Sequence, residues 1–455
     1  MSAEHAHNAD YAAHTATAIN ATHDASLQCW VESAHDAGSD FPVQNLPFAS
    51  FSKLAEPQTA PRCGVGIGHW ILDISAIEEL FEGEAQAAAH ACRQPQLNAL
   101  MAFPSSQLSL LRQQLSQLLC SQDAAVQARI RPALVAQADV QLHLPFKVSG
   151  YTDFFASIHH ATNAGQLFRP DQPLLPNYKY VPIAYNGRAN SVQVSGDKVT
   201  RPKGQLRPAA ELAAPAFAPS ARLDHEVELG IVIGQASTRG QPIAPGAAWQ
   251  HVFGFCLLND WSARDIQAWE YQPLGPFLAK SFATSIAPWV ITAEALAPFH
   301  CPAAPRSAGD PAVLPHLLDD QDMASGGIAI TLDAALSTAR MRAEGIAAHT
   351  LSRSNARSLY WTVAQMLAHH TCNGSALDTA DLLGSGTISG EGDSALGSLL
   401  EITRGGSQRF TLPSGEERSF LQDGDEIILR GHCERAGFVR IGFGECRATI
   451  LAAQP

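Results

Sequence analysis

The stretch that decides the fold is Leu223–Gly234, LDHEVELGIVIG, in which acids regularly interrupt an apolar run. Alternate side chains of a strand face opposite sides, so the pattern predicts a β-strand with Asp224, Glu226 and Glu228 on one face. On a solvated face these acids would only keep the strand soluble. If they were buried without partners, their charges would destabilise the fold. Two interpretations stay open here: an exposed polar face, or carboxylates that converge on a cation.

Length and composition limit the classes of protein that this chain can be. Its 455 residues exceed one ordinary core, so two or more domains are expected, and 34 glycines with 28 prolines indicate many turns and a large β content. A net charge of −13 without a basic block argues against nucleic acid or an anionic membrane as partner. No run of about 18 apolar residues is present, so no transmembrane helix is predicted.

The cysteines and the N-terminus indicate the compartment. Nine cysteines without a CxxC pair are typical of reduced thiols rather than of a disulfide framework or a zinc ribbon. No Lys or Arg precedes Lys53, and the apolar segment of a secretory signal is missing. We therefore expect a cytoplasmic protein.

Changes in composition and hydrophobic pattern along the chain predict three regions. Residues 1–42, rich in Ala, His, Asp and Thr, are expected to form a mobile leader. Residues 43–144 show short strands followed by an amphipathic helix at Leu108–Leu119. Residues 145–455 read as a large, mostly antiparallel β domain, with a surface insertion at 303–325.

One clear helix is predicted inside the large β domain. The segment 354–370, SNARSLYWTVAQMLAHH, places Leu359, Val363 and Met366 along one stripe, and Ser354 is a plausible N-cap. Few other helices are expected after residue 145.

Several familiar chemistries have no motif in this chain. The GxSxG elbow of serine hydrolases, the HExxH zinc motif and the phosphate-binding P-loop are all missing. What remains is a set of acids and bases with the histidine pair His159-His160 in strand and turn contexts. A second pair, His369-His370, closes the predicted helix, where a positive charge is favourable, so it is interpreted as structural. Four of these acids could surround one cation, and an all-oxygen set suits Mg²⁺ or Ca²⁺ rather than zinc. They are Asp153, Glu226, Glu228 and Asp260.

Charge balance favours such a cluster only if cations lie beside it. Four carboxylates and a divalent ion leave a charge of −2, which Lys280 and Arg264 would bring to about neutral. Each residue taken alone is better explained as a turn cap, a surface ion pair or a solvated lysine. His160 is the best candidate for proton transfer, although His159 beside it leaves that choice ambiguous.

Taken together, these motifs resemble the fumarylacetoacetase family over roughly residues 43–453. The blocks that carry the resemblance are YTDFFASIHHATNAGQLFR (151–169), LDHEVELG (223–230), NDWSARDIQAWEY (259–271), GPFLAKSF (275–282) and SGTISG (385–390). The resemblance implies an SH3-like barrel followed by a larger β-roll catalytic domain, assembled as a homodimer. It also implies metal-dependent hydrolysis of 4-fumarylacetoacetate, a small diketo acid, to fumarate and acetoacetate, the last step of tyrosine and phenylalanine degradation.

The resemblance also assigns roles to particular positions. Metal ligands and their neighbours correspond to Asp153, Glu226, Glu228, Asp260, Lys280 and Thr284. His160 corresponds to the general base and Glu401 to the acid that orients it. Lys280, Arg264 and Gln267 correspond to the groups that face the developing oxyanion. Substrate contacts correspond to Phe155, Arg169, Tyr185, Gln267, Tyr271 and Thr387. Asp224 is expected to be a neighbour rather than a ligand.

One position departs from the family pattern: Phe155 stands where a tyrosine is usual. The missing hydroxyl removes a hydrogen bond worth about 0.5–1.5 kcal/mol, so weaker binding or a different substrate is expected. Alternatives are an acylpyruvate hydrolase, an oxaloacetate decarboxylase or a non-catalytic metal-stabilised dimer. A last alternative is a zinc or redox role for the histidines and cysteines, but their irregular spacing disfavours it.

Overall fold

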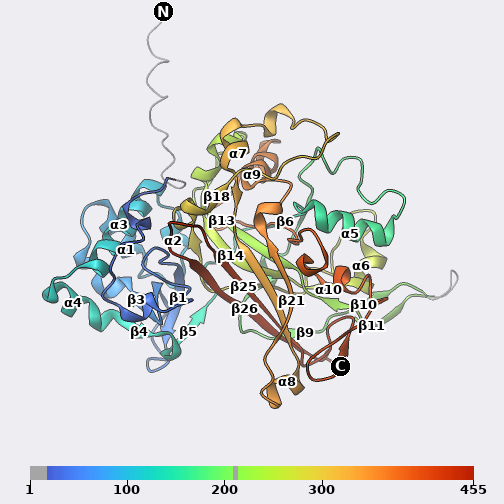
Figure 1. Ribbon diagram of the computed structural model, residues 1–455, viewed down its shortest axis with the longest axis horizontal. Coiled ribbons are helices and arrows are strands. Elements are labelled where there is room, and N and C mark those ends of the chain that lie inside the picture. Colours follow the sequence, from blue (N-terminus) through green and yellow to red (C-terminus); the bar gives the residue numbers. More distant parts are fainter. Residues whose placement is uncertain (1–17, 209–213) are drawn as a thin grey trace, which may run out of the picture.

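A small antiparallel sheet forms the N-terminal part of the computed structural model, which describes residues 18–208 and 214–455 (Figure 1). Its five strands follow the order β4-β3-β2-β1-β5. They are β1 (Phe48–Lys53), β2 (Arg62–Ile67), β3 (Trp70–Asp73), β4 (Leu134–Ala136) and β5 (Val140–His143). Four helices lie in the chain between β3 and β4. They are α1 (Glu84–Ala91), α2 (Asn98–Met101), α3 (Ser105–Cys120) and α4 (Ala124–Ile130). The amphipathic stripe of Leu108–Leu119 therefore lies within α3, as predicted.

Residues 18–42, part of the predicted leader, are packed against the rest of the chain. Val31 and Phe41 are buried, and the ring of Phe41 lies 4.6 Å from that of Trp289. Trp30 donates its indole N–H to the carbonyl of Leu118 at the end of α3. Apolar side chains thus attach this segment to both halves of the molecule, and the rest of the predicted leader, residues 1–17, lies outside the described residues.

Two larger sheets build the remainder of the molecule. The first has eight strands, with seven in the order β7-β6-β22-β13-β14-β16-β8 and β17 beside β14. They are β6 (Tyr151–Phe154), β7 (Ala184–Asn186), β8 (Val192–Val194), β13 (Val227–Ile233), β14 (Val252–Asp260), β16 (Thr284–Ile286), β17 (Ile291–Thr292) and β22 (Leu382–Gly384). The second sheet has the order β21-β20-β25-β26-β9. Its strands are β9 (Val199–Thr200), β20 (Thr331–Ser337), β21 (His349–Asn355), β25 (Glu426–Cys433) and β26 (Ile441–Leu451).

The two sheets pack face to face through β14, which lies against β25 and β26 (Figure 1). Every residue of β13 and β14 is buried, because both faces of these central strands are covered. Short helices lie around this core: α5 (Ile158–Phe168), α6 (Arg264–Glu270), α7 (Asp320–Ser325), α8 (Ala339–Ala343), α9 (Val363–Thr371) and α10 (Leu399–Ile402). The predicted mainly β architecture, with a small N-terminal unit followed by a larger one, is confirmed.

Short strand pairs complete the fold. They are β10 (Lys203–Leu206) with β11 (Ala216–Pro219), β12 (Leu223–Asp224) with β15 (Ser262–Ala263), β18 (His300–Cys301) with β19 (Gly327–Ile328), and β23 (Phe410–Thr411) with β24 (Glu417–Arg418). Among the helices of residues 18–208 and 214–455, none is long and apolar enough to cross a membrane.

Two local predictions differ from the structure. The single strand expected at Leu223–Gly234 is broken at His225 and Glu226 into β12 and β13. The helix expected from Ser354 begins only at Val363, because Ser354 lies in β21 and Thr362 forms the cap with Gln365 as a capping box. In both cases sheet pairing overrides the local pattern.

The buried carboxyl group of Asp322, in the segment 303–325, leads to a prediction about pH. Burial raises the pKa of Asp322 from 3.8 to about 6, against a hydrogen bond from Thr362. A carboxyl group with a raised folded-state pKa favours folding at low pH, and this contribution is lost as the pH rises through 6. At about pH 7.5 the charged form costs about 3 kcal/mol.

The variant Asp322→Asn should therefore raise the melting temperature at about pH 7.5 and raise it less at about pH 4. Asparagine keeps the oxygen that accepts from Thr362 and removes the charge. The exposed neighbour Asp320, changed to Asn, is the matched control and should show no such pH-dependent gain. An equal effect of Asp322→Asn at both pH values would contradict the argument.

Candidate active site

Four buried carboxylates converge at one end of the central strands. Asp153 comes from β6, Glu228 from β13 and Asp260 from the last position of β14, while Glu226 directly precedes β13. One oxygen from each lies within 4.8 Å of the others. The alternation in the sequence therefore placed Glu226 and Glu228 correctly on one side, because each points into this group.

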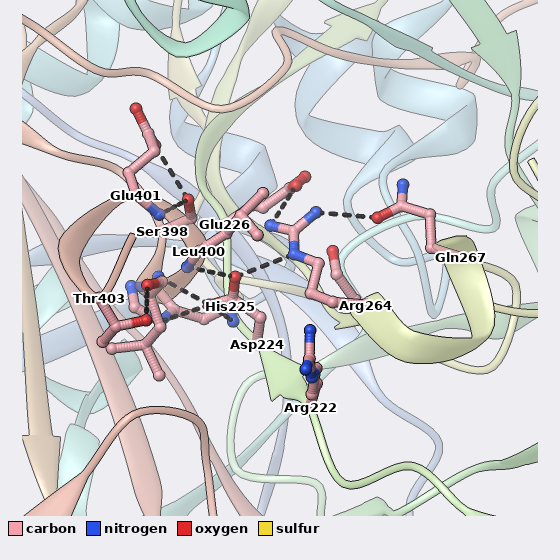
Figure 2. Close-up of polar contacts among 12 residues, drawn as sticks. Arg222, Asp224, His225, Glu226, Arg264, Gln267, Ser398, Leu400, Glu401 and Thr403 are labelled. Carbon is pink, nitrogen blue, oxygen red and sulfur yellow. Dashed lines mark hydrogen bonds and ion pairs between the residues drawn. The ribbon is translucent and has the colours of Figure 1, made fainter. Parts of the chain in front are cut away.

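Asp224 does not belong to the group, because the strand breaks directly after it, at His225 and Glu226. Its carboxylate instead pairs with Arg264, at 2.9 Å from Nε, and accepts the backbone N–H groups of Leu399 and Leu400 (Figure 2). The expectation that Asp224 is a neighbour rather than a ligand thus agrees with the geometry.

A glycine allows the carboxylates to approach one another. A Cβ on Gly384 would lie 2.3 Å from an oxygen of Asp153 and 3.0 Å from one of Glu228. The backbone N–H of Gly386 donates to both carboxylates, at 3.3 and 3.2 Å. The segment that follows β22 therefore forms a wall of the cluster.

Lys280 and Arg264 offset part of the negative charge. Lys280 Nζ lies 2.5 Å from Glu226 and 2.6 Å from Asp260, and Arg264 Nη2 lies 2.7 Å from Glu226. Burial would raise the pKa of Glu226, but Lys280 and Arg264 outweigh it and lower that pKa. Burial lowers the pKa of Lys280 less than its two carboxylate partners raise it, so the lysine stays charged.

Two members of the cluster remain without sufficient cationic partners. Burial is the main cause that raises the pKa of Asp153 well above its usual value, and the negative charge of Asp260 raises it further. The pKa of Glu228 is raised well above its usual value in the same way, by burial first and by the charge of Asp153 second. Glu228 Oε1 and Asp260 Oδ1 are buried and have no hydrogen-bond partner. Four clustered oxygen donors with unused acceptor atoms fit a hard divalent cation, which would supply the missing positive charge.

Of the two adjacent histidines, His160 is the one that contacts Glu401. His160 lies in the first turn of α5, where Ser157 caps the helix, and its Nδ1 is 2.7 Å from Glu401 Oε2. Glu401, in α10, is buried, and although burial opposes it, His160 lowers the pKa of this carboxyl group. Glu226 forms an isolated β-bridge with Ser398, whose hydroxyl donates to Glu401, so the pair lies close to the carboxylate cluster.

Three residues that the sequence analysis missed hold Glu401 in place. Ser389 and Ser398 each donate a hydroxyl to its Oε2 at 2.9 Å, and Asn163 donates to Oε1 at 2.9 Å. Asn163 follows His160 by one helical turn, and Ser398 begins an S-x-x-E pattern that ends at Glu401. The spacing in the sequence could therefore have indicated both residues as partners of this pair. Ser389 carried no such signal, because its partner lies on another segment.

The remaining predicted residues lie at varying distances from this centre. Tyr185 donates its hydroxyl to Asp260 at 2.8 Å, and Thr284 is buried in β16 opposite Asp260. Gln267 accepts from Arg264 Nη1 at 3.2 Å. Phe155 packs edge to face against the ring of His160, with 5.4 Å between centroids.

Three predicted substrate contacts are not joined to the cluster by hydrogen bonds. Arg169 directly follows α5 and donates to the carbonyl of Pro173, and Tyr271 directly follows α6 with 37% of its surface exposed. Thr387 is buried in the segment after β22. A cavity of about 440 Å³, partly lined by Tyr185 and Lys280, opens beside the cluster and is large enough for a small substrate.

Fold and site together define a class: a β-rich enzyme in which a divalent-ion site adjoins a histidine oriented by a carboxylate. Family models match most of the chain: "Fumarylacetoacetase N-terminal" matches residues 44–145 and "Fumarylacetoacetate (FAA) hydrolase C-terminal" matches residues 150–451. The chain belongs to the fumarylacetoacetate hydrolase family, whose members depend on a metal.

Curated relatives from distant organisms match over nearly their full length. Fumarylacetoacetase from Caenorhabditis elegans is 46% identical over 424 residues, and that from Rattus norvegicus is 43% identical over 425 residues. The human fumarylacetoacetase is 42% identical over 425 residues. Each alignment covers 91% of this chain and 97% of the relative.

Proposed function

We propose that this chain is a hydrolase that cleaves the carbon–carbon bond of 4-fumarylacetoacetate to give fumarate and acetoacetate, the last step of tyrosine and phenylalanine degradation. The observation that carries the proposal is the His160–Glu401 pair beside four buried carboxylates. Relatives named fumarylacetoacetase, at 42% to 46% identity, support the choice of substrate.

We propose Mg²⁺ or Ca²⁺ as the ion held by Asp153, Glu226, Glu228 and Asp260. Oxygen-only donors are the ligands that these hard cations prefer. Lewis-acid polarisation of the substrate's carbonyl oxygens is the chemistry that such an ion supplies when bound.

His160 is the general base that activates the water. Glu401 accepts from Nδ1–H, which leaves Nε2 to take a proton from water and stabilises the imidazolium that results. The hydroxide attacks the ketone carbon on the fumaryl side. As the carbon–carbon bond breaks, the electron pair goes to the acetoacetate carbon, which receives a proton from His160 or water.

Hydrogen-bond donors, two of them charged, are the groups that face the carbonyl under attack. Lys280, with Arg264 or Gln267, offsets the charge of the tetrahedral oxyanion, and each such donor is worth about 2.7–4 kcal/mol. Arg169 is suited to bind a terminal carboxylate of the substrate, because its guanidinium group offers two parallel donors. Tyr185, Gln267, Tyr271 and Thr387 remain the predicted substrate contacts.

The experiment that tests this function compares substrates. Purified protein with Mg²⁺ should consume 4-fumarylacetoacetate with a kcat/KM well above that for an acylpyruvate. The opposite ranking would favour the acylpyruvate hydrolase, an alternative for which Phe155 gives a specific reason. No turnover of either diketone by folded, metal-loaded protein would favour a non-catalytic metal-stabilised dimer.

Phe155→Tyr is expected to lower KM for 4-fumarylacetoacetate by about 2- to 10-fold and to leave kcat nearly unchanged. Restoring one hydroxyl adds a hydrogen bond worth about 0.5–1.5 kcal/mol at a position beside the His160 ring. Phe168→Tyr, at an exposed position that ends α5, is the matched control and should change neither constant. A large fall in kcat of Phe155→Tyr would contradict a role confined to binding.

We further propose a homodimer in the cytoplasm, with domain boundaries at 43–144 and 145–455. Apolar side chains exposed around α6 support a partner surface: Trp269, Tyr271, Leu274, Phe277 and Leu278. The nine cysteines are all unpaired, which supports a reducing compartment.

A further inference from the structure

We propose that Asp224 is a positioning residue that binds both Arg264 and the start of helix α10. It thereby fixes the position of Arg264, which faces the developing oxyanion, relative to His160, the base that Glu401 of α10 orients. This role deepens the proposed function and rests on it. Asp224 would touch neither the ion nor the substrate, and no assigned site residue performs this task.

The carboxylate of Asp224 is completely buried and fully used. Oδ1 accepts the backbone N–H groups of Leu399 and His225, each at 2.8 Å. Oδ2 accepts the backbone N–H of Leu400 and Arg264 Nε, each at 2.9 Å. Figure 2 shows Asp224 between the start of α10 and the guanidinium group. Four donors on one carboxylate fix its neighbours on two sides.

On one side Asp224 anchors the helix that orients the base. The amides of Leu399 and Leu400 open α10, and no preceding turn can accept from them. Glu401, the next residue, holds His160 at 2.7 Å. A shift at the start of this four-residue helix would therefore move the carboxylate that sets the orientation of His160.

On the other side Asp224 sets the orientation of Arg264. With Nε held by Asp224, Nη2 lies 2.7 Å from Glu226 and Nη1 donates to Gln267 at 3.2 Å. The guanidinium group is planar, so fixing Nε and Nη2 at two carboxylates leaves it little rotation. Its position relative to the carboxylate cluster is thus determined by Asp224.

Asn in place of Asp224 would preserve volume but not the pattern of acceptors. Whichever way its amide turned, the NH₂ group would meet two N–H donors in a buried site, where unsatisfied donors are costly. Misplacement by about 1 Å of groups that act in the transition state costs about 10²-fold in rate.

The test is a pair of double-mutant cycles on the metal-loaded enzyme. Asp224→Asn should lower kcat about 10²-fold with KM changed by less than about threefold. In the Arg264→Gln background, and again in the Glu401→Gln background, the same substitution should cost about 10-fold rather than about 10²-fold, because one of the two groups through which it acts is already lost. Full losses in either background would overturn the proposal.

A second buried aspartate provides the matched control. Asp425 accepts two hydrogen bonds from Arg418 and one from the backbone of Gln422, and it is 1% exposed. Asp425→Asn should reduce stability and leave kcat of the folded enzyme unchanged. An equal fall in kcat for both variants would reduce Asp224 to a structural residue. If Asp224→Asn does not fold, Asp224→Ser, which keeps one acceptor, enters the same cycles.

A substrate-free measurement separates this proposal from the proposed function. Hydrogen exchange of residues 399–402 should accelerate in Asp224→Asn and stay unchanged in Asp425→Asn. Unchanged exchange in Asp224→Asn would contradict the claim that Asp224 stabilises the start of α10, whether or not the wild-type enzyme turns over 4-fumarylacetoacetate. Wild-type turnover alone decides the proposed function.

Discussion

His160→Ala should lower kcat for 4-fumarylacetoacetate by about 10²–10⁴-fold, which is the usual contribution of a positioned general base. The alanine removes the imidazole that contacts Glu401, while Glu401 keeps the donors Ser389, Ser398 and Asn163. We therefore expect a folded protein with little change in KM. Steady-state kinetics of the metal-loaded variant provide the measurement.

The adjacent histidine makes a close control for this substitution. His159 is half-buried on the same turn of α5, and His159→Ala should retain kcat within about threefold. Should the two alanine variants lose activity equally, the loss would reflect damage to the helix. Full activity of His160→Ala would exclude His160 as the base.

The second large effect concerns the ion. Mg²⁺ or Ca²⁺ at about 100 times its dissociation constant should increase the free energy of unfolding of the metal-free protein by about 2.7 kcal/mol. Glu228→Gln should remove this gain, because Glu228 belongs to the four-carboxylate group. The same variant should be more stable than the wild type without metal, because burial and Asp153 make the charged form of Glu228 unfavourable. Urea unfolding with and without EDTA measures both effects.

Glu294 offers a control carboxylate away from the cluster. It is buried and accepts hydrogen bonds from Asn20 and Ser109. Glu294→Gln should keep the full stabilisation by the ion. An ion that stabilises Glu228→Gln as much as wild type would place the cation elsewhere.

The sequence predicts those parts of the site that depend on local periodicity. Glu226 and Glu228 are two residues apart in an extended segment, so they share a face whatever the rest of the chain does. Asp224 lies two residues earlier, yet it points elsewhere because pairing with β15 ends before His225. No local pattern encodes that break, which arises from contacts with Ser262 and Ala263.

The missed and misplaced features depend on contacts between distant segments. Ser389 supports Glu401 only because the segment after β22 passes beside α10. Ser354 looked like a helix cap, but β20 pairs with its segment and holds it in a strand. The fold class was easier to predict, because repeated short apolar runs with Gly and Pro turns favour stacked sheets over helices.

The most direct test of the account is the product balance of purified wild-type protein with 4-fumarylacetoacetate, measured with Mg²⁺ or Ca²⁺ and with EDTA. We predict that fumarate and acetoacetate appear in equal amounts in the presence of the ion, and that EDTA abolishes both until the ion is restored. Folded, metal-loaded protein that forms neither product, or that forms both undiminished after complete removal of metal, would contradict a metal-dependent hydrolase built on the four carboxylates and His160.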